Sequence, residues 1–151
     1  MRMYYVYMLL CACAAAPVRL KQPLSSGLRP LLGEWRCNDG ASWSFAPDLG
    51  GAFVELRYRE KEYQLKGEIG WDEEGERLVA EAAASDGTTE TASAGNWDGD
   101  ELTFFGVLRD GDRRVNFRRI FRATANGIEV RFELQQDGDF ATPLQQSCLR
   151  N

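Results

Sequence analysis

The sequence contains no histidine. Because histidine is the side chain that most often transfers protons near neutral pH, its absence removes the usual serine and cysteine triads and most zinc and haem ligation. Acidic clusters such as Asp72–Glu74 are expected on turns, where carboxylates are solvated. We therefore expect no enzymatic activity, no cofactor and no metal site.

The sequence also lacks an apolar run of the roughly 20 residues that a transmembrane helix needs. Residues 1–16 carry one arginine, a short apolar stretch and small residues at the end, a layout typical of a secretory signal peptide. The Leu10–Cys13 stretch also resembles a bacterial lipoprotein box, in which Cys13 would be the acylated residue. Both interpretations predict export, and we expect the periplasm, with a lipid anchor at Cys13 as the variant.

Cysteine is scarce, with four in the chain, and Cys11 and Cys13 belong to the predicted leader. Cys37 and Cys148 remain, near the two ends of the mature protein. Two cysteines in an exported domain indicate a disulfide, and two free buried thiols are the alternative.

Positive charge is in deficit, because 18 basic residues face 23 acidic ones and the formal net charge is −5. Long-range repulsion then opposes binding to nucleic acid and to anionic membranes. Hydrophobic residues make up 44% of the chain, which is ordinary for a soluble domain with one core. The expected partner is a small hydrophobic or amphipathic ligand, and the sequence fixes no oligomeric state.

Residues 17–32 hold three of the five prolines and show no clear period. We interpret them as an N-terminal arm with one helical turn at residues 26–32. Residues 33–151 then form the folded domain.

Turn signals recur every eleven to sixteen residues through this domain. They are Asp72–Gly75, Asp86-Gly87, Asp98-Gly99, Asp110-Gly111, Asn126-Gly127 and Asp137-Gly138. Asp-Gly and Asn-Gly favour tight hairpin turns, and the segments between them are rich in β-branched and aromatic residues. Successive hairpins predict an all-β fold, a single up-and-down antiparallel β-barrel of about eight to ten strands, since closure removes exposed edges.

Taking most Asp-Gly and Asn-Gly pairs as centres of two-residue turns also predicts a register, in which Phe121 lies opposite Phe132. One mostly apolar face then continues through the strands after residue 54. Most charged side chains, including Glu90, lie on the other face. Since a slip of one residue would exchange the two faces, this agreement supports the fold.

A G-x-W motif, Gly33-Glu34-Trp35, opens the first expected strand. It resembles the first-strand motif of the lipocalins and their calycin relatives, and the chain from about residue 28 is similar to a bacterial lipocalin-like family of unknown function. The further matching blocks are Leu49–Glu55, Gly67–Asp72, Asn96–Thr103 and Leu149-Arg150. The resemblance implies that Trp35 closes one barrel end beneath an arginine, for which Arg150 is the candidate. It also implies a Cys37–Cys148 disulfide where the first and last strands meet.

Two adjacent strands line the expected barrel with small side chains. These are Ala80, Ala82, Ala84, Thr89, Thr91, Ser93 and Gly95. Small side chains on the inner wall leave room for one small ligand in a barrel of this size. Thr91 and Ser93 are the residues expected to contact it. The alternative is that large aromatic residues fill the interior from the opposite wall, namely Trp71, Phe104, Phe117 and Phe132.

Arg119 is the one charge on the expected inward stripe of residues 115–121. A buried guanidinium without a partner costs several kcal/mol, so it needs an anion or a route to water. Tyr58 and Tyr63 share that face and could help it hold an acidic head group. The alternative is an arginine near a barrel mouth that reaches solvent or covers a tryptophan.

Two functions fit these features. The first is an exported binder of a small amphipathic or acidic hydrophobic ligand, held by Arg119 with Tyr58 and Tyr63. The second is an envelope interaction or scaffold protein with a packed barrel and no ligand, for which outward Phe53 and Phe105 would supply contacts. The run of arginines in residues 113–122 could form an anion-binding ribbon, but Arg118 and Arg122 share the outer face with glutamates of the next strand, so cross-strand ion pairs are expected instead.

Overall fold

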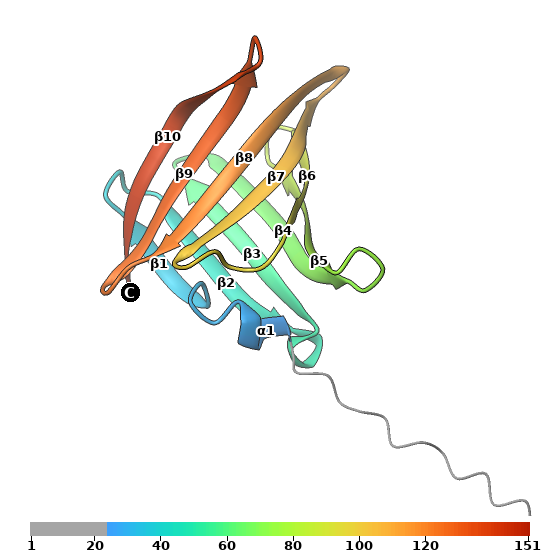
Figure 1. Cartoon of the computed structure of the whole chain (residues 1–151). Coiled ribbons are helices and arrows are strands. Elements are labelled where there is room, and N and C mark those ends of the chain that lie inside the picture. The colour runs from blue at the N-terminus through green and yellow to red at the C-terminus, as the bar shows by residue number, and fades with distance from the viewer. Residues whose placement is uncertain (1–23) are drawn as a thin grey trace, which may run out of the picture.

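The computed structural model describes residues 24–151, so the predicted signal peptide, Cys13 and the first part of the arm lie outside the described residues. Ten antiparallel strands close into one up-and-down barrel, which confirms the predicted fold class (Figure 1). The strands are β1 Gly33–Cys37, β2 Ser42–Asp48, β3 Phe53–Glu60, β4 Tyr63–Asp72, β5 Arg77–Ala84, β6 Thr89–Ala94, β7 Glu101–Asp110, β8 Arg113–Ala123, β9 Gly127–Gln136 and β10 Asp139–Arg150. Within residues 24–151 two short helices accompany them, α1 Leu24–Gly27 and the 3-10 turn Leu49–Gly51.

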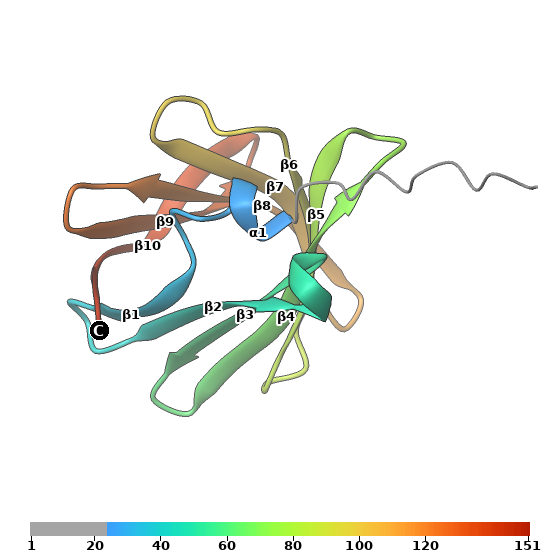
Figure 2. The same ribbon diagram turned by 90° about the horizontal axis from the view of Figure 1, so that it is seen from below.

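The barrel has two different ends. The end where each odd-numbered strand turns into the next even-numbered strand is here called the hairpin end. At the other end α1 lies across the opening of the strand ring (Figure 2). Leu28 and Leu31, which follow α1, are at most 1% exposed, and the Trp35 indole donates to the Leu31 carbonyl at 2.7 Å. The second half of the arm therefore plugs this end of the barrel. The helical turn of the arm was expected at residues 26–32, but α1 ends at Gly27.

The seam between β1 and β10 is short, with three paired positions. One of them is Cys37 with Cys148, and the two sulfurs form a disulfide of 2.04 Å. The predicted disulfide is confirmed, and it joins the first and last strands where the barrel closes. The pairing of Trp35 with Arg150 belongs to the same seam.

Two glycines let the neighbouring strands approach β5 and β6 closely. A Cβ added to Gly67 would lie 2.6 Å from the Cβ of Ala82, and one added to Gly106 would lie 2.6 Å from the Cβ of Ala92. Such distances are closer than side chains tolerate, so only glycine permits this approach of neighbouring strands. The inner face of β5 and β6 is lined mostly by alanines and is here called the alanine wall.

The predicted register is wrong at β6. Ser85–Gly87 form a three-residue loop, since Ala84 N–H donates to the Thr88 carbonyl at 2.8 Å and Gly87 has a φ of 90°. That loop shifts β6 by one residue relative to a two-residue turn and exchanges its faces. The turn after β6 also differs by one residue, with Ser93 paired to Phe105, so β7 regains the predicted faces.

Further along, the predicted pairs are displaced by two residues, which keeps the faces but changes the partners. Phe121 pairs with Val130 rather than Phe132, because the turn spans Thr124–Gly127. Gly127 starts β9 instead of occupying the turn centre. A Cβ there would lie 2.0 Å from the Cys148 carbonyl oxygen, so this glycine is required for strand approach.

Candidate functional site

An aromatic cluster fills the middle of the barrel. Its members come from strands on opposite walls, and the ring centroids of Trp43 and Phe121 lie 5.6 Å apart. Phe45 and Phe121 meet edge to face at 5.5 Å, and Phe104 lies 6.3 Å from Phe121. Of the aromatic residues expected to fill the interior, Phe104 and Phe117 are buried, whereas Trp71 is 38% exposed.

Arg119 lies on the hairpin side of this cluster and points inward, as predicted. Its two terminal nitrogens donate to the carboxylate of Glu90 at 2.8 and 3.0 Å. The side chains are 12% exposed for Arg119 and 5% for Glu90. Because bidentate contacts between charged groups are the strongest hydrogen bonds in proteins, the guanidinium charge is neutralised within the barrel.

Three aromatic rings also surround this guanidinium. Its central carbon lies 5.0 Å from the ring centroid of Phe132 and 5.4 Å from those of Trp43 and Phe117. Such cation–π contacts strengthen when water is excluded. The buried Arg119 Nε, however, has no hydrogen-bond partner in the described part of the chain.

Glu90 was predicted on the outer face, and the shift of β6 explains the error. The same shift turns Thr91 and Ser93 outward, away from the interior that they were predicted to line. Glu90, Ala92 and Ala94 take the inward positions instead. Ala80, Ala82 and Ala84 do face inward, opposite β4 and β6, as predicted.

Tyr58 belongs to a polar network at the hairpin end. Its hydroxyl donates to Glu60 at 2.8 Å and accepts from the amide of Gln146 at 3.2 Å. Gln146 is 1% exposed, donates to Asp39 at 2.6 Å and accepts from the indole of Trp43 at 3.1 Å. These hydrogen bonds connect β2, β3 and β10 through Tyr58 and Gln146. Tyr58 was predicted to contact ligand, and in the structure its hydroxyl serves this network.

Tyr63 lies beside Tyr58, with ring centroids 6.1 Å apart, and belongs to the mouth of the barrel. Partial burial, followed by the negative charge of Glu90, raises the pKa of Tyr63 to about 12. Burial is also the main reason that the pKa of Tyr58 is raised, with its hydrogen bond to Glu60 second. Both phenols stay protonated in the folded barrel at pH values where an unfolded tyrosine ionises.

The raised pKa of Tyr63 predicts how the barrel responds to alkali. Below pH 10 its phenol is protonated in both the folded and the unfolded chain, so it contributes no pH dependence. Between pH 10 and about 12 the unfolded chain releases the proton first, so stability falls as pH rises. Urea unfolding from pH 9 to 11.5 should show this fall, and Tyr63→Phe should make it shallower. An equal slope in the variant would contradict the assignment.

Apolar side chains line the hairpin end above the ion pair and are only partly buried. They point inward from β7 to β10, with the alanine wall of β5 and β6 beside them. They are Leu108, Val115, Phe132, Leu134 and Leu144. This end thus combines an apolar rim with a buried charged pair beneath it.

Arg150 covers the ring of Trp35, with its guanidinium carbon 4.7 Å from the ring centroid. It also donates to the Leu32 carbonyl at 3.1 Å and so holds the plug segment to the last strand. The arrangement implied by the lipocalin resemblance, a tryptophan beneath an arginine at one barrel end, is present.

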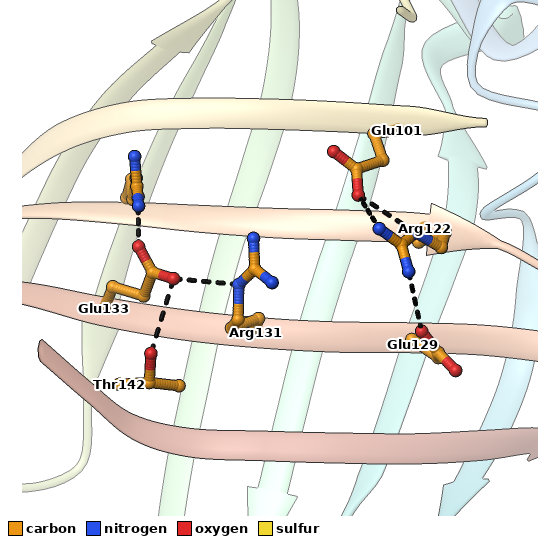
Figure 3. A network of polar contacts seen from close by, with 7 residues as sticks. Glu101, Arg122, Glu129, Arg131, Glu133 and Thr142 are labelled. Atoms are coloured by element: carbon orange, nitrogen blue, oxygen red, sulfur yellow. Dashed lines mark hydrogen bonds and ion pairs between the residues drawn. The ribbon is translucent and has the colours of Figure 1, made fainter. Parts of the chain in front are cut away.

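Arg118 and Arg122 of β8 pair across strands on the outer face, as predicted, and Figure 3 shows the contacts of Arg122. Arg122 contacts Glu101 on β7 and Glu129 on β9, the latter at 3.5 Å. Glu133, only 4% exposed, accepts from Arg118 and also contacts Arg131 at 2.8 Å. These arginines are therefore engaged by glutamates and do not form a free anion-binding ribbon.

Compared with known families and curated proteins, the chain matches no family model and no curated sequence. The closed ten-strand antiparallel barrel is consistent with a calycin-like fold. Residues 24–151 include no helix that is long and apolar enough to cross a membrane.

Proposed function

We propose that this protein is an exported, lipocalin-like barrel that binds a small amphipathic molecule at its hairpin end. The observation that carries the proposal is the pairing of a partly exposed apolar rim with the buried Arg119–Glu90 pair below it. Apolar pockets with a few placed polar groups are the usual form of small-molecule sites. The Cys37–Cys148 disulfide fits an oxidising compartment, and the proposal places the protein in the periplasm, with lipid attachment at Cys13 as the alternative.

The ion pair changes the ligand that we expect. A fatty-acid carboxylate at Arg119 would have to displace Glu90 or lie beside it, and both cost free energy because like charges repel in a desolvated site. The unpartnered Arg119 Nε instead suits one neutral acceptor oxygen. We therefore propose an uncharged head group, such as an alcohol or amide, on an apolar tail.

Three probes of equal chain length test this proposal: hexadecanol, hexadecanamide and palmitic acid. We expect the two neutral probes to bind at least tenfold more tightly than the acid. Binding is measured by native mass spectrometry and by the fluorescence of Trp43, which lies near the guanidinium. Ala84→Phe, on the inner face of β5 at the hairpin end, should abolish binding, while Ala83→Phe, on the outer face, should leave it unchanged. Preference for palmitic acid would refute the proposed head group, and unchanged binding in Ala84→Phe would refute the proposed site.

A second candidate function is the packed scaffold. The aromatic cluster around Trp43 and Phe121 favours it, because those rings occupy the middle of the barrel. On this hypothesis none of the three probes binds. Its contact surface would include Phe105, which is 55% exposed on the outer face.

A further inference from the structure

A groove of about 610 Å³ runs over the outer face of the barrel, away from the interior site. It lies across β1 to β5, and the side chains that line it form two rows in register. In one row Arg36 pairs with Ser42, and Ser42 pairs with Arg59. In the other, Ser44 pairs with Arg57, and Arg57 with Lys66. The short serines of β2 thus form the floor, with Ser42 between Arg36 and Arg59, and Ser44 between Glu34 on β1 and Arg57 on β3.

The groove is basic although the whole chain is acidic. Arg57 and Lys66 share one carboxylate, Glu55, at 2.7 and 3.3 Å. Neither Arg36 nor Arg59 has a side-chain ion pair or hydrogen bond within residues 24–151. Among the described residues, Glu34 is the one acidic side chain that lines the groove, so positive charge predominates there.

We propose that this groove binds a short acidic oligosaccharide. The volume falls in the range of small-molecule sites, roughly 300–1,000 Å³. Guanidinium groups bind carboxylates through paired hydrogen bonds, and the serine floor with Gln64 and Ser85 supplies partners for sugar hydroxyls. Acidic side groups are thus expected beside Arg36 and Arg59, with the sugar rings over Ser42 and Ser44.

The same observations argue against the other polyanions. Three aromatic residues border the groove, Trp35, Trp43 and Tyr58, but they are at most 6% exposed, so no ring face is open for a base to stack on. The outward side chains of the groove include no large apolar group that would enter a bilayer, and the net charge of −5 opposes approach to either DNA or an anionic membrane. A small, flexible anion avoids most of that long-range repulsion.

The test uses trigalacturonate as the acidic probe and maltotriose as a neutral probe of similar size, with binding followed by calorimetry. We expect binding of trigalacturonate only, weakening as salt rises. Arg36→Ser/Arg59→Ser should reduce its affinity at least tenfold. Ser44→Tyr, which keeps every charge but fills the floor, should reduce it similarly.

The control is Arg113→Ser/Arg114→Ser, which removes two exposed arginines from the β7–β8 hairpin. Its affinity for trigalacturonate should stay within twofold of the parent's. An equal loss in this control, no loss in Ser44→Tyr, or no binding of trigalacturonate would overturn the proposal. Comparable binding of a DNA duplex or of phosphatidylglycerol vesicles would overturn it as well, since the groove would then not select for a sugar chain. Because the interior plays no part, these results are independent of the lipid-probe results.

Discussion

Replacing Cys37 and Cys148 together with alanine is expected to lower the free energy of unfolding by about 4–5 kcal/mol. The disulfide closes a loop of 111 residues, and the chain-entropy estimate for a loop of this length is of that size. It also fastens the seam between β1 and β10, which has only three paired positions. Since small domains are stable by about 5–15 kcal/mol, such a loss would bring the barrel close to unfolding.

Urea denaturation measures this loss, and reduced parent protein is the matched control. Reduction keeps both sulfurs in the core and removes only the cross-link, so its effect should approach that of the double alanine variant. The dependence of stability on urea should also steepen, because an unfolded chain without the cross-link exposes more surface. Reduced protein as stable as oxidised protein would show that the cross-link contributes little.

The sequence was sufficient to predict the closed barrel because two independent patterns agree. The Asp-Gly and Asn-Gly pairs mark the hairpins, and the alternation of apolar residues continues across most of them. The seam was predicted through the resemblance at Trp35 and Arg150, and Arg150 does lie over the Trp35 ring. These features depend on local chemistry, which the sequence displays directly.

Loop length was not predictable from the same dipeptides. An Asp-Gly pair fits the centre of a two-residue turn and also the end of a three-residue loop, as at Asp86 and Gly87. Gly127 shows the converse problem, because its missing side chain serves the close approach of β9 and β10. Dipeptide chemistry therefore marks a turn without fixing its register to one residue.

This one-residue error concealed the partner of Arg119. Once an arginine is predicted inside a barrel, the cost of an isolated buried charge predicts a carboxylate nearby. Glu90, which lies between Thr89 and Thr91 on a strand of small residues, was the signal available for that carboxylate. With Glu90 inward, the interior changes from a receptor for anions to a site whose charge is already balanced.

The Arg119–Glu90 pair supplies the second large expected effect. Glu90→Gln should destabilise the barrel by about 3–5 kcal/mol, because it leaves a guanidinium buried without a counter-charge among three aromatic rings. Arg119→Met should cost a similar amount at pH 8, when the carboxylate is left alone. The double variant Glu90→Leu/Arg119→Met should recover most of the loss, since well-packed apolar groups can replace a buried ion pair.

Urea unfolding of the parent, Glu90→Leu, Arg119→Met and their double variant gives the coupling energy between the two side chains, while Glu90→Gln measures the loss of the charge alone. Arg122 with Glu101 is the matched control, because it is also a cross-strand pair of β8 but lies on the outer face with 45% and 30% exposure. Glu101→Gln should leave stability nearly unchanged, since solvent screens such pairs. If Glu90→Gln were equally mild, water would reach Arg119 freely in solution. The ion pair at the hairpin end would then be solvated rather than desolvated, and the preference for a neutral head group would lose its physical basis.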